Sequence, residues 1–68
     1  MPLYEFEGRR PTIGAGSFVH PDAVLIGRVV VGERCYIGAG AVLRADWEDI
    51  IVGNGSNVQD RAVIHVRA

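Results

Sequence analysis

The sequence predicts an all-β fold, a parallel β-helix of about three triangular coils, and three observations support this prediction. An aliphatic residue returns every six positions from Ile13 to Leu43, and after a slip of three residues the period resumes from Val52 to Ile64. A mostly small residue stands four places after each aliphatic one, with Trp47 as the large exception, and glycine often follows the aliphatic residue directly. A period of six fits neither a helix, with about 3.6 residues per turn, nor a plain strand, with a period of about two. It does fit short strands joined by corners, the pattern from which hexapeptide solenoids are built.

The aliphatic residues sort into three inner walls. In an extended triplet the two outer side chains point to one side of the chain and the middle one points to the other. The small and the aliphatic residue of each repeat therefore face inward, and three repeats close one coil. The first wall stacks Ile13, Val31 and Val52, the second stacks Val19, Ile37 and Val58, and the third stacks Leu25, Leu43 and Ile64.

The middle residues of the triplets form outward columns. The third wall presents Val24, Val42 and Val63, and contiguous exposed apolar surface usually marks a contact site. We expect a subunit interface on this valine face, against the plainer alternative that valine simply suits strands. The second wall presents Phe18 and Tyr36.

Composition excludes several classes of protein. The chain is 49% hydrophobic, which is too apolar for a disordered segment, and its single cysteine, Cys35, excludes an internal disulfide framework. A net charge of -1 argues against binding nucleic acid or an anionic membrane through bulk charge. No apolar run approaches the roughly 20 residues that span a bilayer. The first five residues lack a signal-peptide pattern, so we expect the chain in the cytoplasm.

Two segments are expected. Residues 1–12 break the period and are predicted to form an N-terminal strand or cap on the solenoid. Residues 13–68 form the β-helix, which is incomplete at its C-terminal end because the ninth repeat has no cap after it. We therefore expect the first half or less of a longer domain, with poor stability and no activity as 68 residues alone.

Polar residues near the corners are the candidates for chemistry. Arg44 and His65 each follow an inward residue of the third wall, and their separation of 21 residues equals one coil plus the slip. They should therefore lie one above the other, with Asp46 close by. Gln59 and Asp60 occupy the corner before the third wall. An imidazole, a guanidinium and carboxylates beside an interface could form a metal or acid–base site with a small-molecule substrate.

Each candidate also has a plain structural explanation. His65 could be a half-exposed surface residue, Arg44 and Asp46 a surface ion pair worth about 0–1 kcal/mol, and Asp60 a turn residue. His20 is expected to be structural, and Cys35 an inert inward thiol. Zinc normally needs three or four protein ligands, and His65 supplies one. The residues alone therefore predict half a site.

The segments Val42–Asp46, Ile51–Gly53 and Asn57–Asp60, continuing to His65, resemble the γ-class carbonic anhydrase-like family of hexapeptide-repeat proteins. The opening segments Tyr4–Gly8 and Phe18–Gly27 are similar to its CaiE/PaaY branch, named for the carnitine operon and phenylacetic acid degradation. The match covers essentially all 68 residues and corresponds to the N-terminal portion of such proteins.

The resemblance implies a left-handed parallel β-helix that forms a homotrimer through the valine face, with metal sites between subunits. It implies that His65 is the first of three histidine ligands to Zn²⁺, or to Fe²⁺ or Co²⁺ in some relatives. Arg44 would pair with an aspartate across the interface, Asp60 or alternatively Asp46. Gln59 would hold metal-bound water or hydroxide, which attacks CO₂ or, in the phenylacetate branch, a coenzyme A thioester.

The chain departs from the family pattern at several places. The second and third histidines lie on a later coil, beyond residue 68, so these residues alone cannot complete the ligand set. Ala45 stands where close relatives often have glycine, and Trp47 stands where the best-known members carry a proton-shuttling glutamate. Two alternatives therefore stay open: a hexapeptide acyltransferase without a metal, and a non-catalytic trimeric accessory protein of carnitine or phenylacetate metabolism.

Overall fold

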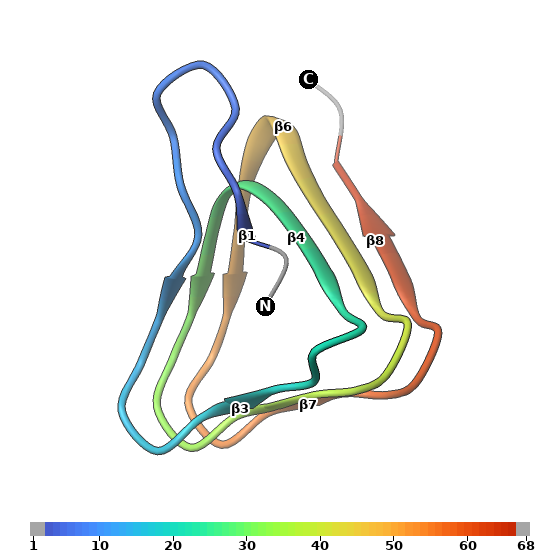
Figure 1. Cartoon of the computed structure of the whole chain (residues 1–68). Coiled ribbons are helices and arrows are strands. Elements are labelled where there is room, and N and C mark those ends of the chain that lie inside the picture. The colour runs from blue at the N-terminus through green and yellow to red at the C-terminus, as the bar shows by residue number, and fades with distance from the viewer. Residues whose placement is uncertain (1–2, 67–68) are drawn as a thin grey trace.

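The computed structural model describes residues 3–66 and shows a solenoid whose strands stack into a triangle when viewed along its axis (Figure 1). The described residues form eight strands: β1 (Leu3–Tyr4), β2 (Thr12–Ile13), β3 (Phe18–Val19), β4 (Val24–Val31), β5 (Tyr36–Ile37), β6 (Val42–Val52), β7 (Asn57–Val58) and β8 (Val63–His65). All the strand pairs within the two sheets are parallel, which confirms the predicted parallel β-helix of about three coils. The predicted small position at Ala68 lies outside the described residues, and so do Met1 and Pro2.

The register of the strands confirms the three inner walls. On the second wall β3, β5 and β7 pair so that Val19 faces Ile37 and Ile37 faces Val58. On the third wall Leu25 faces Leu43, which in turn faces Ile64. The first wall stacks Ile13, Val31 and Val52 in the same way. A repeat of six residues thus becomes a column of side chains, because each coil places equivalent residues above one another.

Strands β4 and β6 each run along the third wall, bend, and continue along the first wall (Figure 1). We call this bend between the third and first walls the apex. At the apex Gly27 pairs with Ala45, but the next pair is Val29 with Ile50. Residues 46–49 of β6 therefore lie opposite one residue of β4, and we call them the apex bulge. The predicted slip of three residues is this bulge.

The bulge explains why Trp47 breaks the small-residue pattern. Ile50, three residues later, faces Val29 and is buried, whereas the Trp47 side chain lies on the surface and is 62% exposed. The small position four places after Leu43 is therefore not the inward one, because that residue is Trp47. The inward residue is Ile50, two places before Val52. The insertion keeps the core regular by moving the large side chain outward.

The interior is filled by aliphatic and small side chains, and no polar or charged residue is buried among residues 3–66. Leu25, Ile37 and Leu43 of the middle coils are fully buried. Val58 and Ile64 of the last coil are only partly buried. Cys35 faces inward as predicted, and its thiol donates to the Gly53 carbonyl oxygen at 3.1 Å. The buried set is Val19, Ala23, Leu25, Val29, Val31, Cys35, Ile37, Ala41, Leu43, Ala45, Ile50 and Val52.

Three outward columns of apolar side chains run across the coils. On the valine face Val24 and Val42 are half-buried and Val63 is exposed. On the second wall the rings of Phe18 and Tyr36 stack with their centroids 5.8 Å apart. A further column was not predicted from the sequence. Thr12, Val30 and the exposed Ile51 stack on the outside of the first wall.

The N-terminal segment adds a strand and a loop to the first coil. Leu3 of β1 pairs with Leu25 of β4 and so adds one residue to the column of Leu25, Leu43 and Ile64 on the third wall. The chain then turns at the apex, where Phe6 and Arg9 form an antiparallel bridge, before β2 joins the first wall. We call residues 5–10 the N-terminal loop. No helix long and apolar enough to cross a membrane occurs in the described part of the chain.

Candidate functional site

Arg44 and His65 lie one above the other at the end of the third wall, as their spacing predicts. They are paired in the register of β6 and β8, and Ile26 of β4 occupies the same column one coil earlier. Their side chains point outward because both directly follow inward residues, Leu43 and Ile64. The stacked strands thus present a guanidinium and an imidazole side by side at the apex.

Asp46 connects these two side chains. The Arg44 Nη2 atom donates to Asp46 Oδ2 at 2.9 Å, and His65 Nε2 lies 3.5 Å from Asp46 Oδ1. The Asp46 side chain is 13% exposed, and its Oδ1 atom has no hydrogen-bond partner among the described residues. We call Arg44, Asp46 and His65 the apex cluster. The hydrogen bond from Arg44 lowers the pKa of the Asp46 carboxyl below its ordinary value, so this group is an anion at neutral pH.

Gln59 and Asp60 lie at a different corner, between the second and third walls. Asp60 Oδ1 accepts a hydrogen bond from the Ala39 backbone N–H at 3.1 Å, and Gln59 Nε2 donates to Asn57 Oδ1 at 2.7 Å. Both side chains therefore bind groups of their own corner. Within one chain Arg44 pairs with Asp46, so pairing with Asp60 across a subunit interface stays a prediction.

The described residues do not provide a complete metal site. Residues 3–66 contain no group of three or more histidine, cysteine or acidic side chains arranged to hold a metal ion. His65 is 32% exposed by side chain and its imidazole adjoins a carboxylate, as ligand histidines commonly do. The other ligands that zinc requires are not supplied by this part of the chain.

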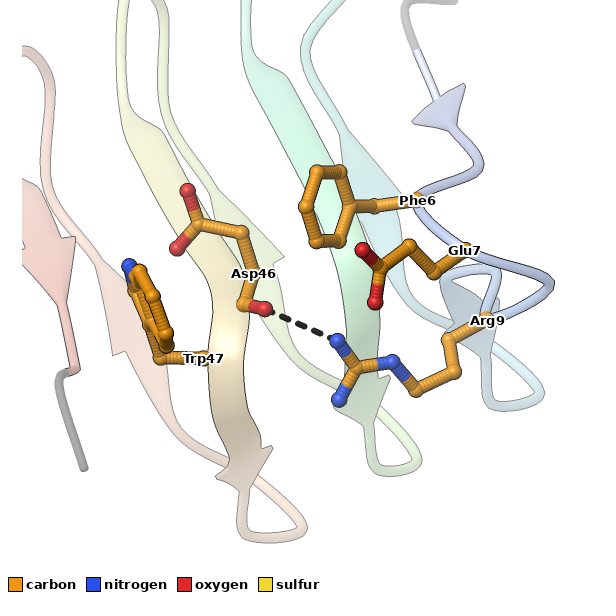
Figure 2. A pocket seen from close by; sticks show the side chains of 5 residues that line it. All are labelled: Phe6, Glu7, Arg9, Asp46 and Trp47. Carbon is orange, nitrogen blue, oxygen red and sulfur yellow. Dashed lines mark hydrogen bonds between the residues drawn. The ribbon is translucent and has the colours of Figure 1, made fainter.

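A small pocket borders the apex cluster and was not predicted from the sequence. It has a volume of about 190 Å³ and is lined by Phe6, Glu7, Arg9, Asp46 and Trp47. Figure 2 shows Phe6, Glu7 and Arg9 of the N-terminal loop on one side of the pocket and Asp46 and Trp47 of the apex bulge on the other. We call it the apex pocket. Only the break in the repeat at Trp47 pointed to this pocket in the sequence. The residues of the N-terminal loop belong to no repeat, so their position could not be obtained by counting.

Arg9 joins the two sides of the apex pocket. Its Nη2 atom donates to the Asp46 backbone oxygen at 2.8 Å (Figure 2), across 37 residues of sequence. This carbonyl lies in the bulge, between the last ladder pair at Ala45 and the next at Ile50, so Arg9 replaces a missing strand partner.

The remaining predicted structural residues have local roles. His20 Nδ1 accepts a hydrogen bond from the Asp22 backbone N–H at 3.0 Å, and the His20 ring meets the edge of Phe18. His20 therefore stabilises the turn in which it lies, and the described structure gives it no contact with the apex cluster.

Comparison with known proteins identifies hexapeptide-repeat proteins, in agreement with the parallel β-helix. Residues 10–45 match the family model described as bacterial transferase hexapeptide (six repeats). The chain is 49% identical over 65 residues to proteins named carnitine operon protein CaiE from three Escherichia coli strains: O1:K1, O139:H28 and K12. The alignment covers 96% of this chain and 33% of each relative, so the chain spans about a third of the length of these proteins.

Proposed function

The chain belongs to the bacterial transferase hexapeptide family and is a CaiE-like hexapeptide-repeat protein, and we propose that the complete protein is a metal-dependent enzyme of the γ-carbonic anhydrase-like type. The observation that carries this proposal is the apex cluster, in which one carboxylate contacts both a guanidinium and an imidazole. In the proposed reaction hydroxide would add to CO₂ to give bicarbonate. With a coenzyme A thioester it would instead add to the carbonyl carbon, and the C–S bond would break to release the carboxylate and the coenzyme A thiol. A divalent metal, Zn²⁺ or alternatively Fe²⁺ or Co²⁺, held in part by His65, would lower the pKa of water and so make hydroxide available near neutral pH.

The residues of the apex cluster take complementary parts in this proposal. His65 supplies one metal ligand, and the neighbouring Asp46 orients its imidazole ring. Arg44 holds Asp46 in place and keeps it ionised, since its hydrogen bond lowers the pKa of that carboxyl. The ligands that residues 3–66 lack would come from the part of the protein that this chain does not span.

A homotrimer assembled through the valine face is part of the same proposal. This face lies on the third wall, between the apex cluster on one side and the corner of Gln59 and Asp60 on the other. Val63 is 67% exposed there, and burying such a column removes apolar surface from water. Packing of a second copy on this face would let Gln59 and Asp60 approach an apex cluster that they do not reach within one chain.

The alternatives differ in what they require of the apex cluster. The family description names transferases, which supports a hexapeptide acyltransferase that needs no metal. The carnitine operon name of the relatives supports the other alternative, an accessory protein of carnitine metabolism without turnover of its own. Metal retention separates the proposal from the first alternative, and turnover of CO₂ or of thioesters separates it from the second.

Substitution of His65 tests the metal ligand. In the complete protein, His65→Ala should abolish bound metal, measured by elemental analysis, because zinc sites with three histidine ligands lose most affinity when one is removed. The matched control is His20→Ala, which removes an imidazole from a turn that does not face the apex cluster. Both variants should keep the β-sheet circular dichroism signal and the trimer mass.

The outcome that contradicts the proposal is equally clear. If His65→Ala retains the metal content of the parent protein, His65 is not a ligand and the metal-dependent function loses its support. If the metal is lost but neither CO₂ nor thioesters are turned over by the parent, the accessory function is favoured.

A further inference from the structure

The apex pocket holds two opposite charges that do not pair with each other. Among residues 3–66 neither the Glu7 carboxylate nor the Arg9 guanidinium has a charged partner, although the same loop contains an Arg10–Glu5 ion pair at 3.7 Å. Both side chains line the pocket. A carboxylate and a guanidinium that face one small cavity without a salt bridge are free to bind a ligand that carries both charges.

Arg9 is held in place by the protein but keeps free donors. Its guanidinium carbon lies 5.9 Å from the centre of the Phe6 ring, and its Nη2 atom is bound to the Asp46 carbonyl oxygen. An arginine has five N–H donors in a planar fork, and most of them remain available here. A ligand carboxylate can therefore bind Arg9 without breaking either contact.

Trp47, on the opposite side of the pocket, carries an exposed aromatic ring. Trp47 is 62% exposed and stacks with no other ring among the described residues. Tryptophan is the best aromatic acceptor for an organic cation, and Glu7 places a negative charge in the same pocket. The ring and the carboxylate together favour a cationic group at this position.

The available acceptors favour an alkylated cation. A primary ammonium carries three N–H donors that require acceptors. The Asp46 carbonyl oxygen is taken by Arg9, Asp46 Oδ2 is taken by Arg44, and Asp46 Oδ1 is sealed from solvent. Among the side-chain acceptors of the lining, this leaves the Glu7 carboxylate. A methylated ammonium needs no acceptor and gains contact with the Trp47 ring.

We propose that the apex pocket binds a small zwitterion in which a methylated ammonium group contacts Trp47 and Glu7 and a carboxylate contacts Arg9. The volume of about 190 Å³ lies below the ~300 Å³ at which sites for drug-sized ligands begin, and so suits a molecule of a few heavy atoms. Because the pocket shares Asp46 with the apex cluster, the bound molecule would lie next to the candidate reaction centre.

The test is a set of binding measurements on the complete, metal-free protein, by calorimetry or ligand-observed NMR at low salt. The probe is glycine betaine, and two analogues each lack one charge: choline lacks the carboxylate, and 3,3-dimethylbutanoate replaces the cationic nitrogen with carbon. We expect betaine to bind about tenfold more tightly than dimethylbutanoate, since the neutral analogue loses both the cation–π attraction to Trp47 and the charge attraction to Glu7. Choline should also bind more weakly than betaine.

Variants locate the binding on the pocket. Glu7→Gln and Trp47→Leu should each weaken betaine binding roughly two- to fivefold, and Arg9→Gln should remove the advantage of betaine over choline. The matched controls are Glu5→Gln and Arg10→Gln, which change the same residue types on the same loop outside the pocket. These controls should bind betaine like the parent.

Three results would overturn the proposal: no binding of betaine, equal binding of betaine and dimethylbutanoate, or betaine binding that Glu7→Gln leaves unchanged. Glu7 is exposed and makes no ion pair among the described residues, so its variant stays informative even if Arg9→Gln fails to fold. The measurement uses metal-free protein, so its outcome is independent of whether His65 binds a metal.

Discussion

Two corners of the solenoid have the same length in every coil, whereas the apex differs from coil to coil and carries the candidate functional residues. The corner between the first and second walls and the corner between the second and third keep the same length from coil to coil, and we call them the regular corners. The apex has a loop in the first coil, a tight bend in the second and a bulge in the third. The apex cluster and the apex pocket both lie where the repeat is interrupted.

Two polar side chains at the regular corners bind the backbone of the previous coil. Asn54 Oδ1 accepts a hydrogen bond from the Glu33 N–H at 2.8 Å, and Asp60 Oδ1 accepts one from the Ala39 N–H at 3.1 Å. Each side chain thus fastens its own coil to the previous one. At the apex, Asp46 binds other side chains instead. A solenoid can therefore vary one corner while the other two maintain the stacking.

The largest expected effect comes from filling the tight bend of the apex. Gly27 has a φ of 78°, and a Cβ built on it would lie 2.3 Å from the Ala45 carbonyl oxygen. Gly27→Ala should therefore lower the free energy of unfolding by about 2–5 kcal/mol, since it combines left-handed strain with a clash against backbone. Urea denaturation of the complete protein would measure this loss.

The matched control lies at a regular corner. Gly55 has a φ of 72°, but a Cβ there would meet no atom within 4 Å. Gly55→Ala should cost only the strain, about 1–2 kcal/mol. Equal losses in the two variants would show that the second coil does not pack tightly under the bulge.

A smaller effect distinguishes the two explanations of Asp60. Asp60→Ala removes the acceptor for the Ala39 N–H and should lower the free energy of unfolding by about 1 kcal/mol. Asp60→Asn keeps an Oδ1 acceptor, as Asn54 does in the equivalent bond, so stability should change by less than about 0.5 kcal/mol.

Turnover of these variants completes the test. If Asp60 acts in the proposed site, Asp60→Asn should lose activity at unchanged stability. Full activity in a stable Asn variant would restrict Asp60 to the turn.

The smallest expected effect is a pH dependence at the apex. The pKa of Asp46 is held below its ordinary value of 3.8 by the hydrogen bond from Arg44. The folded state therefore binds this proton less readily than the unfolded chain, and the stabilisation is complete above pH 3.8. It is lost as the pH falls through the lowered pKa of the folded state.

Comparison of unfolding curves with and without this carboxylate isolates its contribution. Asp46→Asn should remove part of the acid sensitivity of the parent protein. An unchanged acid limb in Asp46→Asn would show that the Arg44–Asp46 bond does not contribute to folding.

The positions along each column follow from counting, and this part could be predicted from the sequence. Arg44 and His65 stack because 21 residues equal one coil plus the bulge, and Val24, Val42 and Val63 align for the same reason. Stacked strands repeat the same register, so spacing along the chain becomes position in space. The assignment of inward residues failed at Trp47, because counting forward from Leu43 ignores the extra residues of the bulge.

Contacts between residues that lie outside the six-residue repeat could be seen only in the tertiary structure. Asp46 meets Arg44 and His65 because the bulge turns its side chain toward them, and Arg9 reaches Asp46 across 37 residues because the N-terminal loop folds over the apex. The repeat contains no information about either arrangement. The fold and the position of the candidate metal ligand, His65, therefore follow from the spacing of residues along the chain. The apex cluster and the apex pocket form only when the coils stack and the N-terminal loop folds over the apex.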